Sequence, residues 1–600
     1  SAAAGNRALV WARMRASPLA EEGQQPVFAA IDNAFARVRA DFPGVTLQWT
    51  GVNRFAAASR ARIEAEMRIL NLASIAGVLL IAALFVRRVH RIVHLLPVIL
   101  CSLAGAWTVA TMSFDRLHIL VFVIGSLLSG VAIDYGVYIF LQPPQHEGEP
   151  YGAKLRRLLK PLLASCLTTA LGFSLLLFSD LPLIREIGLF VGAGLLCALG
   201  SAMLYFAQIS RPYLEPRPFL ASSPAPGASN CHTLYDNRRR WLSRVLLGIA
   251  VVVALVGPWR LQWRDDVHQL DLPAPELHAN DDAVRSLFGE NQHRSLYLTY
   301  GDTFAAARQN LATFLDHLNR IEPNAPASSL GLLVPTEADW QAFPARLREL
   351  GGFETDFSRA LDRHGFLADS FRSFFNAWRD LRANPPRGSY AGLVATVDSL
   401  LTGPLSLLSS HSGTPAWLLT IVDAPAAAAP PPALHTISVD QLQSLNHLFT
   451  RYRWSALRLS LVGLALVIGS VFVIYPFRRG LRIALIPAGS CFFVFGLFGL
   501  LGLTLNLFNL LGAFLGVCLS HNYSIFSSDA AATGSAPPVA IRLSAFCTAT
   551  SFGMLAFSHI PVIHALGLTV ALIVLTALTT VELESFARRT TALETAKKRE

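Results

Sequence analysis

Long apolar segments alternate with short polar turns along most of the chain. Eleven of them approach the 20 or so mostly apolar residues that an α-helix needs to cross a bilayer. They form a group of six and a group of five, separated by a polar stretch of roughly 200 residues. The expected spans are 69–86, 92–113, 117–141, 161–179, 187–209, 241–259, 456–476, 483–503, 504–526, 541–558 and 562–581. This pattern predicts a multi-span α-helical membrane protein.

The long polar block between the two groups of spans predicts an α+β domain outside the bilayer. Arg294–Tyr300 and Trp417–Val422 are strand-like, whereas Thr303–Ile321 and Phe366–Leu381 repeat their apolar residues with the period of a helix.

A smaller polar segment precedes the first span. Strand-like Val45–Trp49 is followed by helical Phe55–Met67, which is the order expected at the end of a similar domain. The predicted order is a remnant of a first periplasmic domain (1–68), a five-span membrane repeat (69–210), a cytoplasmic linker (211–240), the first span of a second repeat (241–260), a second periplasmic domain (261–455), five more spans (456–585) and a cytoplasmic tail (586–600).

Composition supports the membrane class and excludes a soluble enzyme. Only 15% of the residues are charged, against about 25% in soluble domains, and the mean hydropathy is +0.43. The net charge of +10 arises from Lys and Arg beside alternate turns rather than along one face, so nucleic acid is not an expected partner. By the positive-inside rule these turns are cytoplasmic and the 261–455 block is outside.

The chain contains an internal repeat. A shift of 379 residues aligns 165–189 with 544–568 without a gap, and 11 of the 25 positions are identical. A shift of 386 aligns Gly130–Phe140 with Gly516–Phe526. Both halves run in the same direction, which predicts two parallel pseudo-symmetric repeats. The second repeat consists of one span, an outside domain and five further spans. By symmetry, the first repeat should also begin with a span and a complete domain, so we expect a twelve-span parent protein that continues on the N-terminal side of residue 1.

Asp134 is the most informative single residue. A carboxylate at bilayer depth costs about 2.5–3.5 kcal/mol, so an intramembrane acid is a functional candidate by default. Ser126, Gly130 and Tyr138 lie on the same predicted helix face at spacings of four. We expect Asp134 to load and release a proton with Tyr135 beside it. The alternative is a buried acid that only hydrogen-bonds a neighbouring helix.

In the second half, Ser520 aligns with Asp134 and His521 aligns with Tyr135, and Tyr523 follows two residues later. If the two helices face each other, Asp134 and His521 could form a switchable pair. The alternative is a neutral His521 satisfied by a serine or a backbone carbonyl.

Several other small or polar residues accompany these helices. The Gly512-x-x-x-Gly516 spacing, continued by Ser524, predicts close helix packing. Candidate supports of the relay on the next helix of each half are Thr168, Thr169 and Thr548. Asp180 and His559 align with each other at the outer ends of matched spans.

No metal site or cofactor is expected, since His559 and His564 lack a third ligand at suitable spacing. A P-loop is also excluded, because its lysine follows a glycine and none of the chain's four lysines does. An ion gradient is then the remaining energy source, and the protein is expected to be a secondary transporter rather than an enzyme.

These features resemble the resistance–nodulation–division (RND) superfamily. Within it, the Gly-Val-Ala-Ile-Asp-Tyr-Gly sequence at 130–136, Leu171-Gly172-Phe173 and Ser179-Asp180-Leu181-Pro182 are similar to MMPL-type exporters of Gram-negative bacteria. The resemblance implies proton-driven export of a hydrophobic or lipid-like molecule from the inner membrane, with an aryl-polyene lipid of the xanthomonadin kind as one candidate. This chain departs from the family at Ser520-His521-Asn522-Tyr523, where a second Asp-Tyr pair is common.

The expected partners are membrane lipid, protons and the hydrophobic or lipid substrate, with a second copy or an envelope protein as further candidates. The alternative function is a non-transporting relative, such as a sterol- or lipid-sensing protein, a scaffold or a helper of protein translocation, whose proton relay has decayed.

Overall fold

A computed structural model gives the fold of the chain. Apart from the isolated positions 10, 14 and 245, it describes residues 24–115, 117–145, 149–209, 213–217, 247–264, 275–287, 295–323, 326–385, 388–400, 409–410, 415–422, 430–439, 441–533 and 538–597. Most of the expected linker at 211–240 lies outside these residues. The chain divides into two compact units, each assembled from two segments. We call residues 55–274 with 445–600 the membrane unit, and residues 1–54 with 275–444 the α+β unit.

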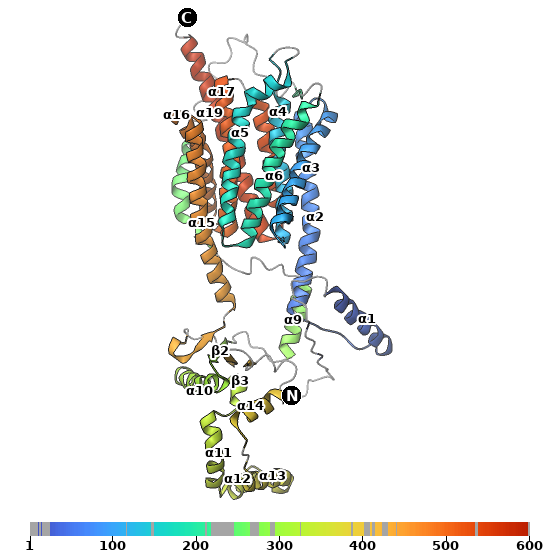
Figure 1. Cartoon of the computed structure of the whole chain (residues 1–600), viewed down its shortest axis with the longest axis vertical. Coiled ribbons are helices and arrows are strands. Elements are labelled where there is room, and N and C mark those ends of the chain that lie inside the picture. Colours follow the sequence, from blue (N-terminus) through green and yellow to red (C-terminus); the bar gives the residue numbers. More distant parts are fainter. Residues whose placement is uncertain are drawn as a thin grey trace. The chain divides into compact units, whose positions relative to one another are not determined.

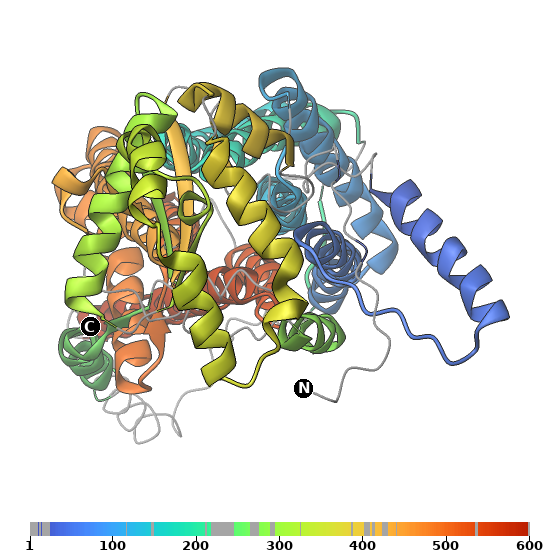
Figure 2. The same ribbon diagram turned by 90° about the horizontal axis from the view of Figure 1, so that it is seen from below.

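The membrane unit is a bundle of long apolar helices that run side by side (Figure 1). Its first five are α2 (Val52–Phe85), α3 (Leu96–Ser113), α4 (Ile119–Leu141), α5 (Tyr151–Leu175) and α6 (Pro182–Ala207). Its last five are α15 (Gln441–Ile474), α16 (Phe477–Leu500), α17 (Leu507–Thr533), α18 (Pro538–Leu555) and α19 (Pro561–Lys597). The two sets occupy adjoining parts of the bundle, the first blue to teal and the second orange to red in Figure 2.

Eight helices in the described part of the chain are long and apolar enough to cross a membrane. Shorter apolar helices at Leu128–Leu141, Leu247–Arg260 and Val539–Leu555 fall at the other three expected positions. The predicted class, a multi-span helical membrane protein with two parallel repeats, is therefore confirmed.

Several helices extend well beyond the apolar segments that revealed them. α5 begins at Tyr151, ten residues before the expected span, and contains Pro161. α2 is one continuous helix of 34 residues, so the expected helix at Phe55–Met67 runs directly into the first span. The strand expected at Val45–Trp49 was wrong, because residues 45–50 form no strand in the structure. Instead, the guanidinium group of Arg54 stacks over the Trp49 ring and donates to its carbonyl oxygen.

Helices α2, α4 and α15 end at the same end of the bundle, which we call the basic end. Its turns carry Arg87, Arg88 and Arg91 in the first half and Arg478, Arg479 and Arg482 in the second. The outer turns, at the other end, are those that follow α3, α5, α16 and α18.

The α+β unit contains a five-stranded antiparallel sheet. Its order is β3 (Ala327–Ser329), β5 (Ala416–Val422), β2 (Ser295–Gly301) and β6 (Thr436–Ser438), and β4 (Ser409–Ser410) also pairs with β5. β2 and β5 pair along their whole length, from Ser295 opposite Val422 to Gly301 opposite Ala416. Alternate residues of both strands are buried, which is the pattern that predicted them.

Helix α10 (Phe304–Ile321) packs against the inner face of this sheet. Its buried residues Leu311, Phe314 and Leu318 recur at helical spacing and form one apolar cluster with Tyr297 and Leu418 of the strands. The helix starts at Thr303, whose side chain accepts a hydrogen bond from the Ala306 amide. This is the usual role of threonine at an N-cap position.

The same unit contains a helical region made of α11 (Glu337–Glu349), α12 (Phe353–Arg363), α13 (Arg372–Ala383) and α14 (Tyr390–Leu400). The expected helix at Phe366–Leu381 is α13, preceded by a single 3₁₀ turn at Ala368–Phe371. Phenylalanine rings join α12 to α13, with Phe357 and Phe374 centroids 5.3 Å apart.

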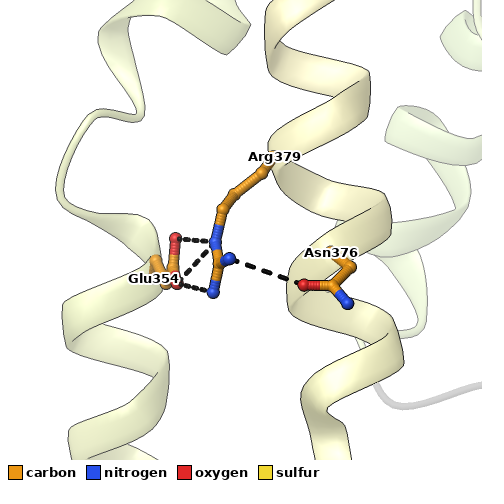
Figure 3. Close-up of polar contacts among 3 residues, drawn as sticks. All are labelled: Glu354, Asn376 and Arg379. Atoms are coloured by element: carbon orange, nitrogen blue, oxygen red, sulfur yellow. Dashed lines mark hydrogen bonds and ion pairs between the residues drawn. The ribbon is translucent and has the colours of Figure 1, made fainter.

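Beside these rings, Arg379 of α13 reaches across to α12. Its Nε and Nη2 both donate to the Glu354 carboxylate, and its Nη1 donates to Asn376 (Figure 3). The paired geometry fixes the orientation of the two helices, although an exposed ion pair adds only about 1 kcal/mol or less.

Candidate functional site

Asp134 lies on α4 and is 2% exposed. α4 packs against α6 on one side and α18 on another. Neither carboxyl oxygen of Asp134 makes a hydrogen bond to any described residue. Its polar neighbour on α18 is the Ser544 hydroxyl, and it interacts electrostatically with the hydroxyls of Tyr138 and Tyr523. The acid is therefore surrounded by hydroxyl groups from three helices.

These three hydroxyls are free to change their hydrogen-bond partners. The oxygens of Tyr138, Tyr523 and Ser544 are all buried and form no hydrogen bond within the described structure. A hydroxyl can donate to an ionised carboxylate or accept from a protonated one, whereas a carboxylate can only accept. The site is therefore chemically suited to either protonation state of Asp134.

Asp134 differs in this respect from the other buried acids of the membrane unit. Among the described residues these are Glu186 and Asp529. Glu186 accepts the backbone amide of His118 at 2.7 Å. Asp529 accepts the Tyr475 hydroxyl at 2.8 Å and interacts electrostatically with Lys160. Of the acids that the structure describes in this unit, only Asp134 combines burial with an unpaired carboxyl group.

Tyr135 points to a different helix from Asp134. Its hydroxyl is buried, and its polar neighbours are Cys166 and Ser165 on α5. It also interacts electrostatically with Asp134. The structure thus places Tyr135 beside the acid, on the side that faces α5.

The expected pair between Asp134 and His521 is not formed. His521 uses Nδ1 within its own helix, at 2.8 Å from the Val517 carbonyl oxygen. Because a carbonyl only accepts, Nδ1 carries the proton. The buried Nε2 has no hydrogen-bond partner in the part of the chain described. The structure therefore agrees with the alternative for Nδ1, in which the His521 side chain donates to a backbone carbonyl instead of pairing with Asp134.

Helix geometry explains why the pair fails. Successive residues of an α-helix are turned by about 100°, so residues two apart lie on nearly opposite faces. Tyr523 of α17 faces Asp134, and the Phe526 ring of the same helix stacks on Tyr138 with centroids 3.5 Å apart. His521, two residues before Tyr523, consequently points away from the acid.

The second half has its own polar cluster, directed at α5. Asn522 accepts hydrogen bonds from Ser165 at 2.7 Å and from Thr169 at 3.2 Å. Ser520 is fully buried, and its hydroxyl has no hydrogen-bond partner among the described residues. The position that corresponds to Asp134 is therefore neutral.

The three threonines named as supports have different roles. Thr548 of α18 donates to the Gly130 carbonyl of α4 at 3.2 Å and is a polar neighbour of Tyr523. It joins the Asp134 helix to α18. Thr169 belongs to the Asn522 cluster, and Thr168 donates to the Ser165 carbonyl within α5.

The small residues of the predicted packing stripe do allow close helix contacts. A Cβ atom at Gly130 would lie 2.5 Å from the Ser551 Cβ, which only glycine permits. Gly512 and Gly516 face α19 instead, where added Cβ atoms would meet Leu566 and Ile573.

The two serines of the stripe add little to the site. The Ser524 hydroxyl donates to the Ser520 carbonyl, four residues earlier in its own helix. The side chain of Ser126 lies outside the described part of the structure.

Four polar residues of these clusters were not predicted: Ser165, Asn522, Ser544 and Cys547, whose thiol also interacts with Asp134. The signal for two of them was present, since the gapless alignment begins with Ser165 over Ser544. In the structure each serine faces a polar residue of the opposite half: Ser165 faces Asn522, and Ser544 faces Asp134.

In the described residues, no group of three His, Cys, Asp or Glu side chains could hold a metal ion.

Comparisons with known proteins agree with this architecture. Residues 3–204 match the sequence profile of the MMPL family. The chain is similar to a heavy metal efflux pump, at 12% identity and a TM-score of 0.50, over 94% of this chain and 72% of the pump. It is also similar to SecDF, a translocon-associated membrane protein from Thermus thermophilus, at 13% identity and a TM-score of 0.46, over 89% of this chain. The chain spans 62% of the length of that SecDF. No curated protein matches the sequence.

The MMPL match and the fold shared with the efflux pump confirm the predicted resemblance to RND and MMPL-type proteins. The family match itself covers residues 3–204, and the likeness to the efflux pump concerns the fold.

Proposed function

Starting from the MMPL match of residues 3–204 and the fold shared with an efflux pump, we propose that this protein is a secondary active exporter driven by the proton gradient. The cargo is a hydrophobic or lipid-like molecule, and the coupling site is Asp134. The protein acts in the bacterial inner membrane, with the α+β unit in the periplasm. An aryl-polyene lipid is the first substrate to test.

The observation that carries the proposal is the unpaired, buried carboxyl group of Asp134. A fixed negative charge in such surroundings is expensive, whereas a protonated carboxyl is neutral. Binding and release of one proton therefore changes the interaction of α4 with α17 and α18. This gives the bundle two states of different charge, as coupled transport requires.

The energy available is sufficient for such a cycle. Each proton that crosses the membrane yields about 2.3 kcal/mol per 100 mV. If Asp134 takes up its proton from one side of the membrane and releases it to the other, the cycle runs in one direction of transport. Access of the cargo then alternates between the two states of the bundle.

The test is a deletion strain complemented by the full-length gene or by its Asp134→Asn form. Asparagine keeps the size of the side chain but cannot exchange a proton. We expect the deletion to retain a lipid or pigment in the inner membrane, the wild-type gene to release it, and Asp134→Asn to fail at normal expression.

Asp180→Asn is the matched control. Asp180 is an exposed acid at an outer turn, so this variant should export normally. Full export by Asp134→Asn would refute proton coupling at this site. A defect confined to secreted proteins, with unchanged lipids, would favour the translocation-helper alternative.

A further inference from the structure

Helix α18 is bonded along α2 as well as along the Asp134 helix. The Ser551 and Ser74 hydroxyls are 2.8 Å apart, and both residues are fully buried. One turn along, the Cys547 thiol donates to the Val78 carbonyl at 3.8 Å. Between them, a Cβ atom at Gly77 would lie 2.9 Å from Thr550. These contacts form a close polar seam between α18 and α2.

The seam continues at the outer turn that follows α18. One carboxyl oxygen of Glu66, Oε1, accepts both the Ser558 hydroxyl at 2.6 Å and the His559 amide at 2.7 Å. We call this contact the Glu66 clasp. Glu66, Ser74 and Val78 lie at spacings of eight and four residues, so they share one face of α2.

The contacts of α18 with α4 lie at the same level. Ser544 neighbours Asp134, Thr548 binds the Gly130 carbonyl, and Ser551 packs against Gly130 itself. Any shift of α18 caused by a change of charge at Asp134 therefore reaches α2 through the seam and the Glu66 clasp.

The other half contains a counterpart of the clasp but no acid to drive it. Ser455 of α15 donates to Asp180, at the outer turn after α5, at 2.7 Å. Asp180 aligns with His559, so this contact occupies the equivalent place in the repeat. The equivalent of Asp134 in that half, however, is Ser520.

We propose that Glu66 is a positioning residue for transport, which makes α2 follow α18 when Asp134 gains or loses its proton. α2 continues without a break from Phe85 to Val52, which belongs to the α+β unit. The clasp thus selects α2, rather than α15, as the helix that transmits the change. This inference rests on the proposed function of Asp134.

Spin-label distances in the reconstituted full-length protein test this directly. Labels introduced as non-natural amino acids leave Cys547 and the other cysteines intact. Exposed positions suit them: Leu501 after α16 as reference, Phe557 for the α18 turn, and Ile69 for α2. The 501–557 and 501–69 distances are compared between Asp134 and Asp134→Asn, which mimics the protonated state.

We expect Asp134→Asn to shift both distances. With Glu66→Ala added, the 501–557 distance should still shift, whereas the 501–69 shift should become smaller, because only the seam contacts at Ser74 and Val78 then remain. Glu66→Gln should restore it, because both donors bind a single oxygen that the amide retains. Ser455→Ala, which breaks the counterpart contact, should leave both shifts as in the parent protein.

A 501–69 shift that is undiminished in Glu66→Ala would overturn the role of the clasp, and so would a reduced shift that Glu66→Gln fails to restore. If Asp134→Asn shifts neither distance, the failure lies in the proposed coupling at Asp134 and the inference falls with it. Export assays add a second readout: Glu66→Ala should lower kcat with little change in KM, and Glu66→Gln should recover it.

Discussion

At the scale of single residues, the partners of each buried acid decide its role. Asp529 accepts a hydrogen bond from the Tyr475 hydroxyl and Glu186 accepts one from the His118 backbone amide, so each carboxyl group already has a fixed donor. Among the described residues, the polar groups around Asp134 are the rotatable hydroxyls of Tyr138, Tyr523 and Ser544 and the Cys547 thiol. This contrast is the physical basis for assigning proton coupling to Asp134 rather than to either of the others.

The Tyr138 hydroxyl can be tested without disturbing its ring. Tyr138→Phe keeps the stack on Phe526 but removes one possible donor to the Asp134 carboxylate. A hydrogen bond to a charged group is worth about 1.5–3 kcal/mol, so export should slow by about tenfold or more.

Tyr205→Phe provides the comparison. Its hydroxyl hydrogen-bonds His94, away from the Asp134 cluster, so its loss should leave the export rate near normal. Transport assays at equal protein level make the measurement. An undiminished rate in Tyr138→Phe would remove this hydroxyl from the account.

A second prediction concerns the contact between α4 and α18. Gly130→Ala would force a Cβ atom to within 2.5 Å of Ser551. The two helices must then separate, at a cost of about 1–3 kcal/mol. Gly200→Ala on α6 meets no atom within 4 Å and should be neutral or stabilising by up to about 1 kcal/mol. Thermal unfolding midpoints in detergent should therefore fall for Gly130→Ala only.

The sequence identified Asp134 but not its surroundings. A carboxylate in a bilayer has a high free-energy cost, so an acid in an apolar segment stands out whatever its neighbours are. Whether His521 or Tyr523 reaches it depends on the rotation of α17, which is set by packing. Because successive residues of a helix are turned by about 100°, His521 and Tyr523 cannot both face the acid from one straight helix.

At the scale of elements, apolar length located the helices but not their ends. α5 starts at Tyr151 and α15 at Gln441, because their polar first turns are also helical. Hydropathy detects only the part of a helix that contacts lipid or core. In the α+β unit, strict alternation located β2 and β5 to within one residue. Residues 45–49 have the composition of a strand, but no strand in the described part of the chain pairs with them.

The N-cap of α10 provides a test at this scale. Thr303→Ala removes the side-chain acceptor of the Ala306 amide and should cost about 1 kcal/mol. Amide exchange in the first turn of α10 should then rise about fivefold in the full-length protein. Thr313→Ala, an exposed position inside the same helix, should not increase it. Equal exchange in both variants would show that the cap contributes nothing.

At the scale of the whole molecule, the repeat predicted two equivalent halves, and the structure shows how they interlock. α18 of the second half packs on α4 of the first, and α5 of the first half packs on α17 of the second. The helices equivalent to each other, α5 and α18, therefore each contact the opposite half. An alignment shows which helices are equivalent but not which ones touch. The crossed contacts, and the Glu66 clasp that depends on them, therefore could not be predicted from sequence.

The central claim is that Asp134 itself gains and loses a proton. Infrared difference spectra of the reconstituted protein between acidic and alkaline buffer measure this without knowledge of the cargo. The account predicts a band from the C=O stretch of a protonated carboxyl that disappears in Asp134→Asn and persists in Asp529→Asn. A spectrum without such a band, or one unchanged by Asp134→Asn, would contradict it.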